Sequence, residues 1–213
     1  WTKKVLVQAE KNEDVLAIYR TITGKMVKFG AQGVALAAGM TIDSIDAHDG
    51  FNPAKGQIGC LLFPAVLAIA LEQEASGKEF LATLLMGYEF GARVAMAQHG
   101  TVPDYHTSGS WGAVTAAAAC ARLMKFTAEE TRHALGIAEY HAPRSQMMRC
   151  IDHSTMLKDG SGWGAMTGFS AAKLAEKGFT SVPALTVEDA DICWSDLGQR
   201  WYMNEQSYKP YPV

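Results

Sequence analysis

Apolar residues recur at helical spacing along most of the chain, in segments separated by polar stretches. Thr127 and Glu130 form a capping-box pattern that marks one helix start, and Pro64 is expected in the first turn of another helix, where its missing N–H costs nothing. No strand alternation is expected before residue 180, although 201–203 has the character of a strand, so the fold class is all-α. The spacing predicts helices over 12–23, 29–41, 64–74, 79–98, 111–125, 127–140 and 164–176.

Three of these helices, 29–41, 111–125 and 164–176, consist largely of Gly, Ala and other small residues on more than one face. Small side chains allow helices to approach closely, and a helix that is apolar all round is buried on all sides. Three such helices in one domain have more apolar surface than the neighbouring helices can bury. We therefore expect a homodimer formed by the helical domain, burying more than about 2,000 Å² in total.

Composition, charge and cysteine count limit the classes of protein to which the chain can belong. The 213 residues are 48% hydrophobic and 19% charged, which suffices for a sizeable core. A formal charge of −3 gives no reason to expect nucleic acid or an anionic membrane as partner. The apolar run 61–71 is too short to span a bilayer, and the first residues lack a signal-peptide layout. Four cysteines without a CxxC pair indicate buried thiols in a reducing compartment, so we expect a cytoplasmic enzyme or binding protein.

Three polar segments, 43–57, 99–110 and 141–159, separate the small-residue helices. The third leads through a glycine-rich turn at 159–162 into a helix, an arrangement typical of binding loops on a rigid scaffold. If the three segments converge, their carboxylates, imidazoles and lysines form a pocket suited to proton abstraction next to a carboxylate. The alternative is a set of solvated loops, or a satisfied polar network in a binding protein.

Other chemistries are disfavoured by spacing. Asp46, His48, Asp49 and His106 are admissible zinc ligands, but they match no recognised zinc spacing and HExxH is absent, so no metal is expected. The GxSxG elbow of serine hydrolases is also absent. GSGWGAMTG at 160–168 is similar to a dinucleotide-binding loop, yet no strand precedes it. Asp152 and Asp159 are expected to cap turns.

Six pieces of the chain occur in a characteristic order: SIDAHDG (44–50), FPAVLAIALEQEASGKEF (63–80), GYEFGARV (87–94), YHTSGSWGAVTAAAACARLM (105–124), MLKDGSGWGAMTGFSAAKLAEKGFT (156–180) and YKPYP (208–212). This order resembles the MmgE/PrpD family, which includes 2-methylcitrate dehydratase, cis-aconitate decarboxylase and iminodisuccinate epimerase. The resemblance implies a cofactor-free enzyme, usually homodimeric, with a large helical domain and a smaller α+β domain. It assigns 1–203 to the helical domain and 204–213 to the connection toward an α+β domain after residue 213.

The resemblance also implies site residues. It places an active-site aspartate at Asp46, and the chain departs from the family at Gln57, where a histidine is usual. Glutamine forms hydrogen bonds but does not move a proton at neutral pH. The catalytic residues implied are Asp46, His106, Lys158 and Lys209, and those expected to bind substrate are Asp49, Lys55, Gln57, Tyr105 and Thr107.

The predicted function is that of a cofactor-independent lyase or isomerase, a dehydratase, decarboxylase or epimerase, acting on a small di- or tricarboxylate. His106 or Lys158 would move the proton next to a carboxylate and Asp46 would orient the base. Lys158 and Lys209 would neutralise the negative charge of substrate and enolate. The alternative is a non-catalytic helical module for small-molecule binding or dimerisation, which Gln57 and the lack of a second domain favour. Convergence of the three polar segments on one cavity distinguishes the two.

Overall fold

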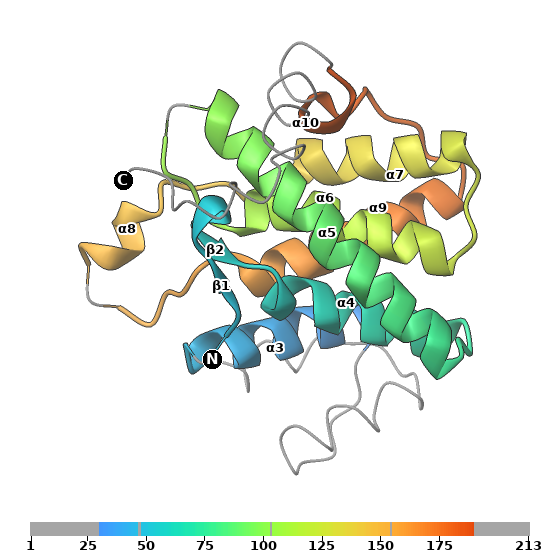
Figure 1. The fold of residues 1–213 in the computed structure, drawn as a ribbon, viewed down its shortest axis with the longest axis horizontal. Coiled ribbons are helices and arrows are strands. Elements are labelled where there is room, and N and C mark those ends of the chain that lie inside the picture. The colour runs from blue at the N-terminus through green and yellow to red at the C-terminus, as the bar shows by residue number, and fades with distance from the viewer. Residues whose placement is uncertain (1–29, 47, 103, 154, 190–213) are drawn as a thin grey trace, which may run out of the picture.

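The computed structural model describes residues 30–46, 48–102, 104–153 and 155–189. This part of the chain is a bundle of α-helices (Figure 1), which confirms the all-α class. The helix expected at 12–23 and the strand expected at 201–203 lie outside the described residues. The elements are α3 (Ala31–Ser44), β1 (Gly50–Phe51), η2 (Asn52–Ala54), β2 (Gly56–Gln57), α4 (Gly59–Glu72), α5 (Gly77–Thr101), α6 (Gly109–Leu123), α7 (Ala128–His141), α8 (Met148–Ile151), α9 (Ser161–Glu176) and α10 (Leu185–Glu188).

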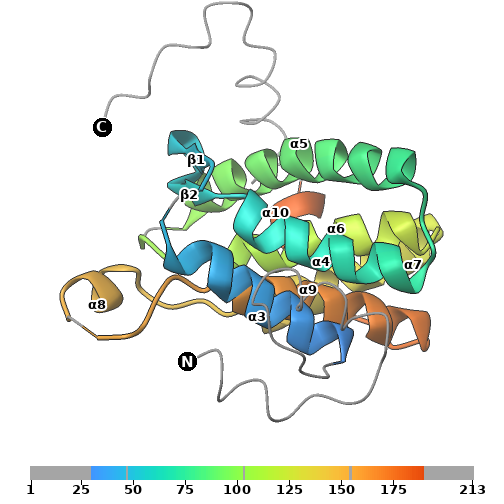
Figure 2. The ribbon, with the colours of Figure 1, turned by 90° about the horizontal axis from the view of Figure 1, so that it is seen from below.

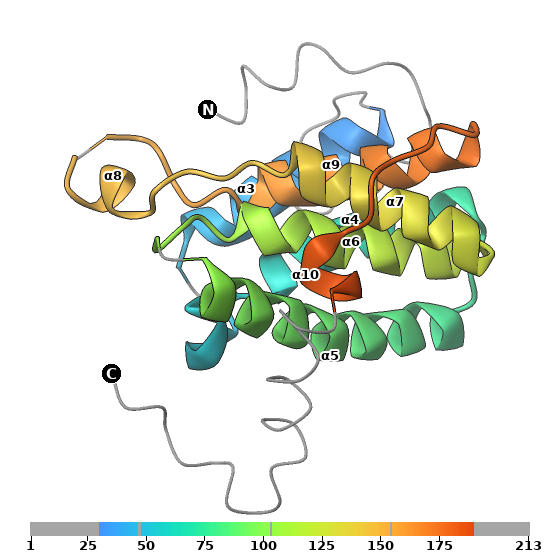
Figure 3. The same cartoon turned by 90° about the horizontal axis from the view of Figure 1, so that it is seen from above.

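Helix α6 is the centre of the bundle. It packs against α4, α5, α7 and α9, and it is buried along nearly its whole length because its residues are mostly Ala and Gly. Figures 2 and 3 show α3 and α5 on opposite sides of the bundle, with α9 beside α3 and with α4 and α6 between the two sides. A single chain therefore covers α6 on all sides, without the second copy that the apolar pattern suggested for it.

Two glycines show how closely the helices pack. A Cβ at Gly168 of α9 would overlap the backbone carbonyl of Ala113 in α6. A Cβ at Gly39 of α3 would lie 2.7 Å from Cα of Gly162 in α9. Contacts this tight leave no room for a side chain. They place the start of α9 directly beside both α3 and α6.

Helix α4 begins at Gly59, so Pro64 lies inside it and not in the first turn as predicted. The early start has a cap: both carboxylate oxygens of Asp49 accept the backbone N–H of Gly59, at 3.0 and 3.2 Å. A carboxylate at this position also complements the helix dipole. The capping box predicted for α7 is confirmed, because Thr127 and Glu130 bond reciprocally.

Two histidines were assigned to loops wrongly, and one hairpin was missed. His99 lies inside α5, which continues to Thr101, and His141 is the last residue of α7, so neither belongs to a loop. A short antiparallel hairpin, β1–β2, also precedes residue 180, with Gly50 opposite Gln57. Each strand has two residues, which is too short for alternation to appear in the sequence.

Across the described ranges, none of the helices combines the length and the apolar character needed to cross a membrane.

Candidate active site

One cavity of about 240 Å³ lies where the three polar segments meet. The first segment supplies the end of α3 and the β1–β2 hairpin, the second supplies Tyr105, and the third supplies the residues around α8 and the start of α9. The segments thus converge, as the enzyme hypothesis requires, and are not scattered over the surface. The lining residues are Asp43, Asp46, His48, Lys55, Gln57, Tyr105, Met147, Cys150, Ile151, Leu157, Lys158 and Asp159.

Asp43 is the buried acid of this cavity. It lies in the last turn of α3 and is 1% exposed. The side-chain amide of Gln57 donates to its Oδ1 at 2.9 Å, whereas Oδ2 is buried without a hydrogen-bond partner among the described residues. Burial, and then the nearby charge of Asp159, raise the pKa of Asp43 to about 6, while Lys158 and Gln57 act in the opposite direction. Asp43 can therefore gain or lose a proton near neutral pH.

Asp46 and Lys158 form an ion pair at the mouth of the cavity. Lys158 Nζ lies 2.7 Å from Asp46 Oδ1, joining residues 112 positions apart. The hydrogen bond lowers the pKa of Asp46 and raises that of Lys158, so both groups stay charged. Asp46 has a φ of 50°, in the left-handed region that aspartate tolerates better than most residues.

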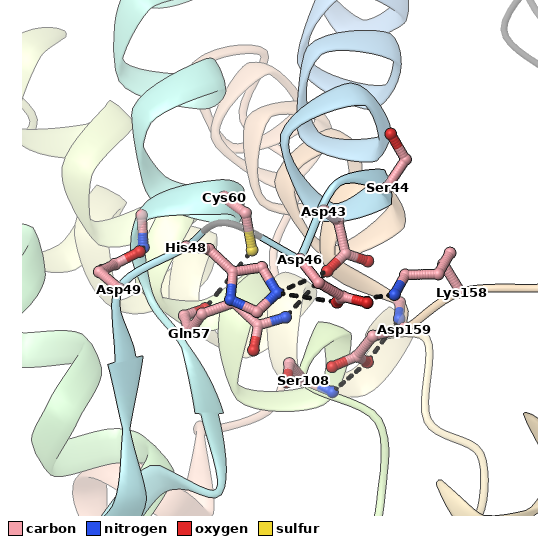
Figure 4. Close-up of polar contacts among 12 residues, drawn as sticks. Asp43, Ser44, Asp46, His48, Asp49, Gln57, Cys60, Ser108, Lys158 and Asp159 are labelled. Atoms are coloured by element: carbon pink, nitrogen blue, oxygen red, sulfur yellow. Dashed lines mark hydrogen bonds and ion pairs between the residues drawn. The ribbon is translucent and has the colours of Figure 1, made fainter. Parts of the chain in front are cut away.

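His48 joins the two aspartates (Figure 4). Its Nε2 lies 3.2 Å from Asp46 Oδ1 and 3.7 Å from Asp43 Oδ1. The three side chains offer ligand atoms within 4.8 Å of one another, which a metal ion would accept. The Lys158 ammonium, however, already supplies positive charge at Asp46. The negative charge of the cluster is thus balanced in part by a side chain of the protein itself.

Asp159 connects the cavity to the bundle. Its Oδ1 accepts the backbone N–H groups of Ser108, at 2.7 Å, and of Gly160, at 2.5 Å. These bonds tie the segment before α6 to the start of α9. Asp159 caps a turn, as expected, and it also lines the cavity.

Five of the predicted site residues line the cavity: Asp46, Lys55, Gln57, Tyr105 and Lys158. Lys55 and Tyr105 lie side by side at its rim, with Lys55 Nζ 5.8 Å from the centre of the Tyr105 ring. Lys55 has a φ of 51°, and non-glycine residues in the left-handed region are frequent at functional sites.

The other predicted residues have different surroundings. Asp49 caps α4 and is not part of the lining. Thr107 donates to the carbonyl of Pro143 and accepts from the N–H of Ser145, each at 3.3 Å, so its hydroxyl holds two loops together. Lys209 lies outside the described residues.

His106 lies beside the cavity and is absent from its lining. The ring is 1% exposed and stacks on His99, with 4.3 Å between ring centres. Its Nδ1 lies 2.9 Å from the carbonyl of Asp104, so Nδ1 carries the hydrogen and Nε2 the lone pair. Burial lowers the pKa of His106. This imidazole is therefore neutral at physiological pH.

Four polar lining residues were not among the predicted site residues: Asp43, His48, Asp159, and Cys150 of α8. The sequence suggested His48 only as a zinc ligand and Asp159 only as a turn cap. Asp43 and Cys150 lie within the polar segments, but no spacing marks either of them. Asp43 is in the last turn of α3, whereas Asp46 lies beyond the end of that helix with a φ of 50°, so helical spacing does not relate the two.

The MmgE/PrpD N-terminal domain model matches residues 6–196. The chain belongs to the MmgE/PrpD family. The match includes every described element of the bundle, so the cavity belongs to an MmgE/PrpD N-terminal domain.

One curated relative of this MmgE/PrpD chain is the cis-aconitate decarboxylase-like protein oryM of Aspergillus oryzae (strain ATCC 42149 / RIB 40). The two are 27% identical over 174 residues, which is 77% of this chain and 36% of the relative. The chain thus spans about a third of that relative's length. The family and this similarity support a role of the lyase type in general terms.

Proposed function

We propose that the cavity is the site of a cofactor-independent lyase or isomerase that moves a proton next to a carboxylate of a small di- or tricarboxylate. The observation that carries the proposal is Asp43, a buried carboxyl with a pKa of about 6 that lines a cavity with Lys158 and has one oxygen without a hydrogen-bond partner among the described residues. A proton-transfer group works best when its pKa lies near the working pH.

The roles divide between the buried and the exposed groups. Asp43 removes or delivers the proton, and His48, in contact with Asp43 and Asp46, is the second proton carrier. Lys158 provides the positive charge that stabilises the substrate carboxylate and the enolate that develops beside it. Asp46 holds the Lys158 ammonium in place through the 2.7 Å bond.

Dehydration is the reaction we propose first, because loss of water next to a carboxylate needs one base for the proton and one acid for the hydroxyl. Asp43 and His48 supply such a pair within one cluster. Decarboxylation or epimerisation would use the same enolate and the same lysine. His106, buried behind the cavity, contributes in this proposal by holding the segment that carries Tyr105.

The test is proton exchange in heavy water. A panel of di- and tricarboxylates is incubated with the full-length protein, and deuterium incorporation next to each carboxylate is followed by proton NMR. The proposal expects exchange at one carbon of at least one compound, well above the protein-free rate. Binding without exchange for every compound would favour the non-catalytic module, and no binding would exclude both.

A further inference from the structure

Three side chains at and just beyond the end of α3 have the spacing of a metal-binding cluster. Asp43, Asp46 and His48 each offer one ligand atom, and these atoms all lie within 4.8 Å of one another. His48 Nε2 lies 3.2 Å from Asp46 Oδ1 and 3.7 Å from Asp43 Oδ1 (Figure 4). Two ligands of a tetrahedral zinc ion lie about 3.3–3.5 Å apart, because each is about 2.0–2.2 Å from the metal. The cluster is therefore close to the spacing that zinc requires.

Two of the atoms in this cluster are buried and unpaired. Asp43 is 1% exposed, and its Oδ2 has no hydrogen-bond partner among the described residues. Nε2 of His48 is also buried without a hydrogen-bond partner in the same part of the chain. Buried polar atoms are seldom left unpaired, and those that are often contact an ion or water or have a function. Both residues line the cavity, so an ion that enters the cavity can reach them.

The ligand set favours one class of ion. Calcium and magnesium take oxygen ligands, whereas an imidazole nitrogen suits zinc and the neighbouring transition metals. Three protein ligands leave the fourth tetrahedral position open to water. Of the zinc ligands considered from the sequence, Asp49 caps α4 and His106 is enclosed behind the cavity. Asp43 takes their place in the cluster.

Lys158 competes with an ion for the same oxygen. Its Nζ lies 2.7 Å from Asp46 Oδ1, which is also the oxygen nearest to His48 Nε2. A divalent ion held between His48 and this oxygen would lie next to the ammonium and be repelled by it. Because the Lys158 side chain is 32% exposed, it can turn toward solvent. Binding of an ion therefore requires Lys158 to leave Asp46.

We propose that Asp43, Asp46 and His48 form a binding site for a divalent ion of the zinc class, and that the bound ion displaces Lys158 and inhibits the reaction. The inhibition rests on the proposed function, whereas the binding does not. The ion would occupy the side chains of Asp43 and His48 that move the proton, and it would separate Lys158 from Asp46. In this role the ion is an inhibitor, and the proposed reaction stays cofactor-independent.

The first test measures Zn²⁺ binding to the full-length protein at neutral pH, by competition with a chromophoric chelator. One ion per chain should bind, and His48→Ala should weaken binding about tenfold or more, since even the loss of a residue that only supports a ligand costs about 10–100-fold. His141→Ala is the matched control: this exposed histidine ends α7 and lines a different cavity, so its loss should leave the affinity unchanged. Equal affinities in the two variants would place the ion elsewhere and overturn the site.

The second test concerns the displacement of Lys158. Lys158→Met removes the competing charge and should bind Zn²⁺ about tenfold or more tightly than the unmodified protein. Lys173→Met, whose lysine pairs with Glu72 and Glu176, should bind as the unmodified protein does. No gain in Lys158→Met relative to this control would overturn the displacement. Zn²⁺ should also raise the melting temperature of every variant that binds it, which checks that the variants are folded.

The inhibition is tested by adding Zn²⁺ to the proton-exchange assay. Exchange should fall as the site fills, and excess chelator should restore it. Exchange that continues at saturating Zn²⁺ would overturn the inhibition and leave the binding site in place. If the zinc-free protein shows no exchange with any compound, the proposed function fails, and the inhibition fails with it. The binding measurements still decide the site in that case.

Discussion

The side-chain amide of Gln57 donates a 2.9 Å hydrogen bond to the buried Oδ1 of Asp43. The residue that departs from the family's usual histidine therefore contacts the carboxyl that we place at the centre of the chemistry. This bond lowers the pKa of Asp43 and opposes the effect of burial. Gln57 therefore favours the ionised form of Asp43, although burial outweighs it and the pKa is raised overall.

Replacing Gln57 with Leu removes this donor and leaves a second buried oxygen of Asp43 unpaired. We expect the pKa of Asp43 to rise further, so that the acidic limb of the pH–rate profile for proton exchange moves from about pH 6 to higher pH. The profile is measured on the compound that exchanges fastest. An unshifted limb in Gln57→Leu would mean that another group titrates there.

Asp43→Asn should raise stability above pH 6. The folded pKa of about 6 exceeds the unfolded value of 3.8, so the protonated carboxyl favours folding below pH 3.8 and this contribution is lost as pH rises through 6. An amide carries no charge to bury, and we expect a gain of about 1–3 kcal/mol at pH 8. The gain should vanish near pH 4. Denaturant unfolding at both pH values measures it, and equal stabilities at pH 8 would contradict the burial of an ionised Asp43.

Lys158→Met should reduce exchange about 100-fold or more, because the positive charge beside the enolate is lost. Stability should change by less than about 1 kcal/mol, since Lys158 is 32% exposed and Asp46 is 68% exposed. Lys173→Met is the matched control, as Lys173 pairs with Glu72 and Glu176 outside the cavity lining. Equal loss of exchange in both variants would indicate a general effect of removing charge.

Gly168→Ala should destabilise the fold by about 1–3 kcal/mol, because the added Cβ would overlap the carbonyl of Ala113 in α6. At Gly77, by contrast, a Cβ meets nothing within 4 Å, and alanine favours a helix over glycine. Gly77→Ala should therefore leave stability unchanged or raise it slightly. Thermal unfolding of the pair tests the close α6–α9 packing, and similar melting temperatures would contradict it.

The homodimer remains a prediction, but the surface that supports it is now on α5 and not on the small-residue helices. Helix α6 is covered within one chain, but Leu81 and Leu85 are 65% and 74% exposed one turn apart on α5. We expect light scattering at micromolar concentration to give twice the chain mass, with Leu85→Glu shifting it toward the monomer. A stable monomer in the unmodified protein would show that no second copy is needed.

Helices were predictable from the sequence because their apolar spacing is local. The all-α class and the capping box at Thr127 follow from neighbouring residues alone. Helix ends were harder to predict from the sequence where a distant side chain determines them. The start of α4, for example, depends on Asp49, which accepts the backbone N–H of Gly59 from the other end of the hairpin. His99 was assigned to a loop because its segment is polar, although α5 continues through it.

The site could be predicted only in outline. Convergence of the three polar segments was posed as the observation that separates the enzyme from the non-catalytic module, and Lys158 lines the cavity where they meet. Burial could not be inferred, and burial separates Asp43, whose pKa is raised, from the exposed Asp46, whose pKa is lowered. For the same reason His106 was expected in the cavity, whereas its ring is enclosed behind it.

The most direct test of the central claim is deuterium exchange next to a substrate carboxylate, measured for the unmodified protein, Asp43→Asn and His106→Gln in parallel. If Asp43 moves the proton, Asp43→Asn should lose exchange about 100-fold or more while remaining folded at pH 8. His106→Gln should retain a much larger share, because His106 does not line the cavity. Exchange that survives in Asp43→Asn and disappears in His106→Gln would contradict the assignment of Asp43 as the group that moves the proton.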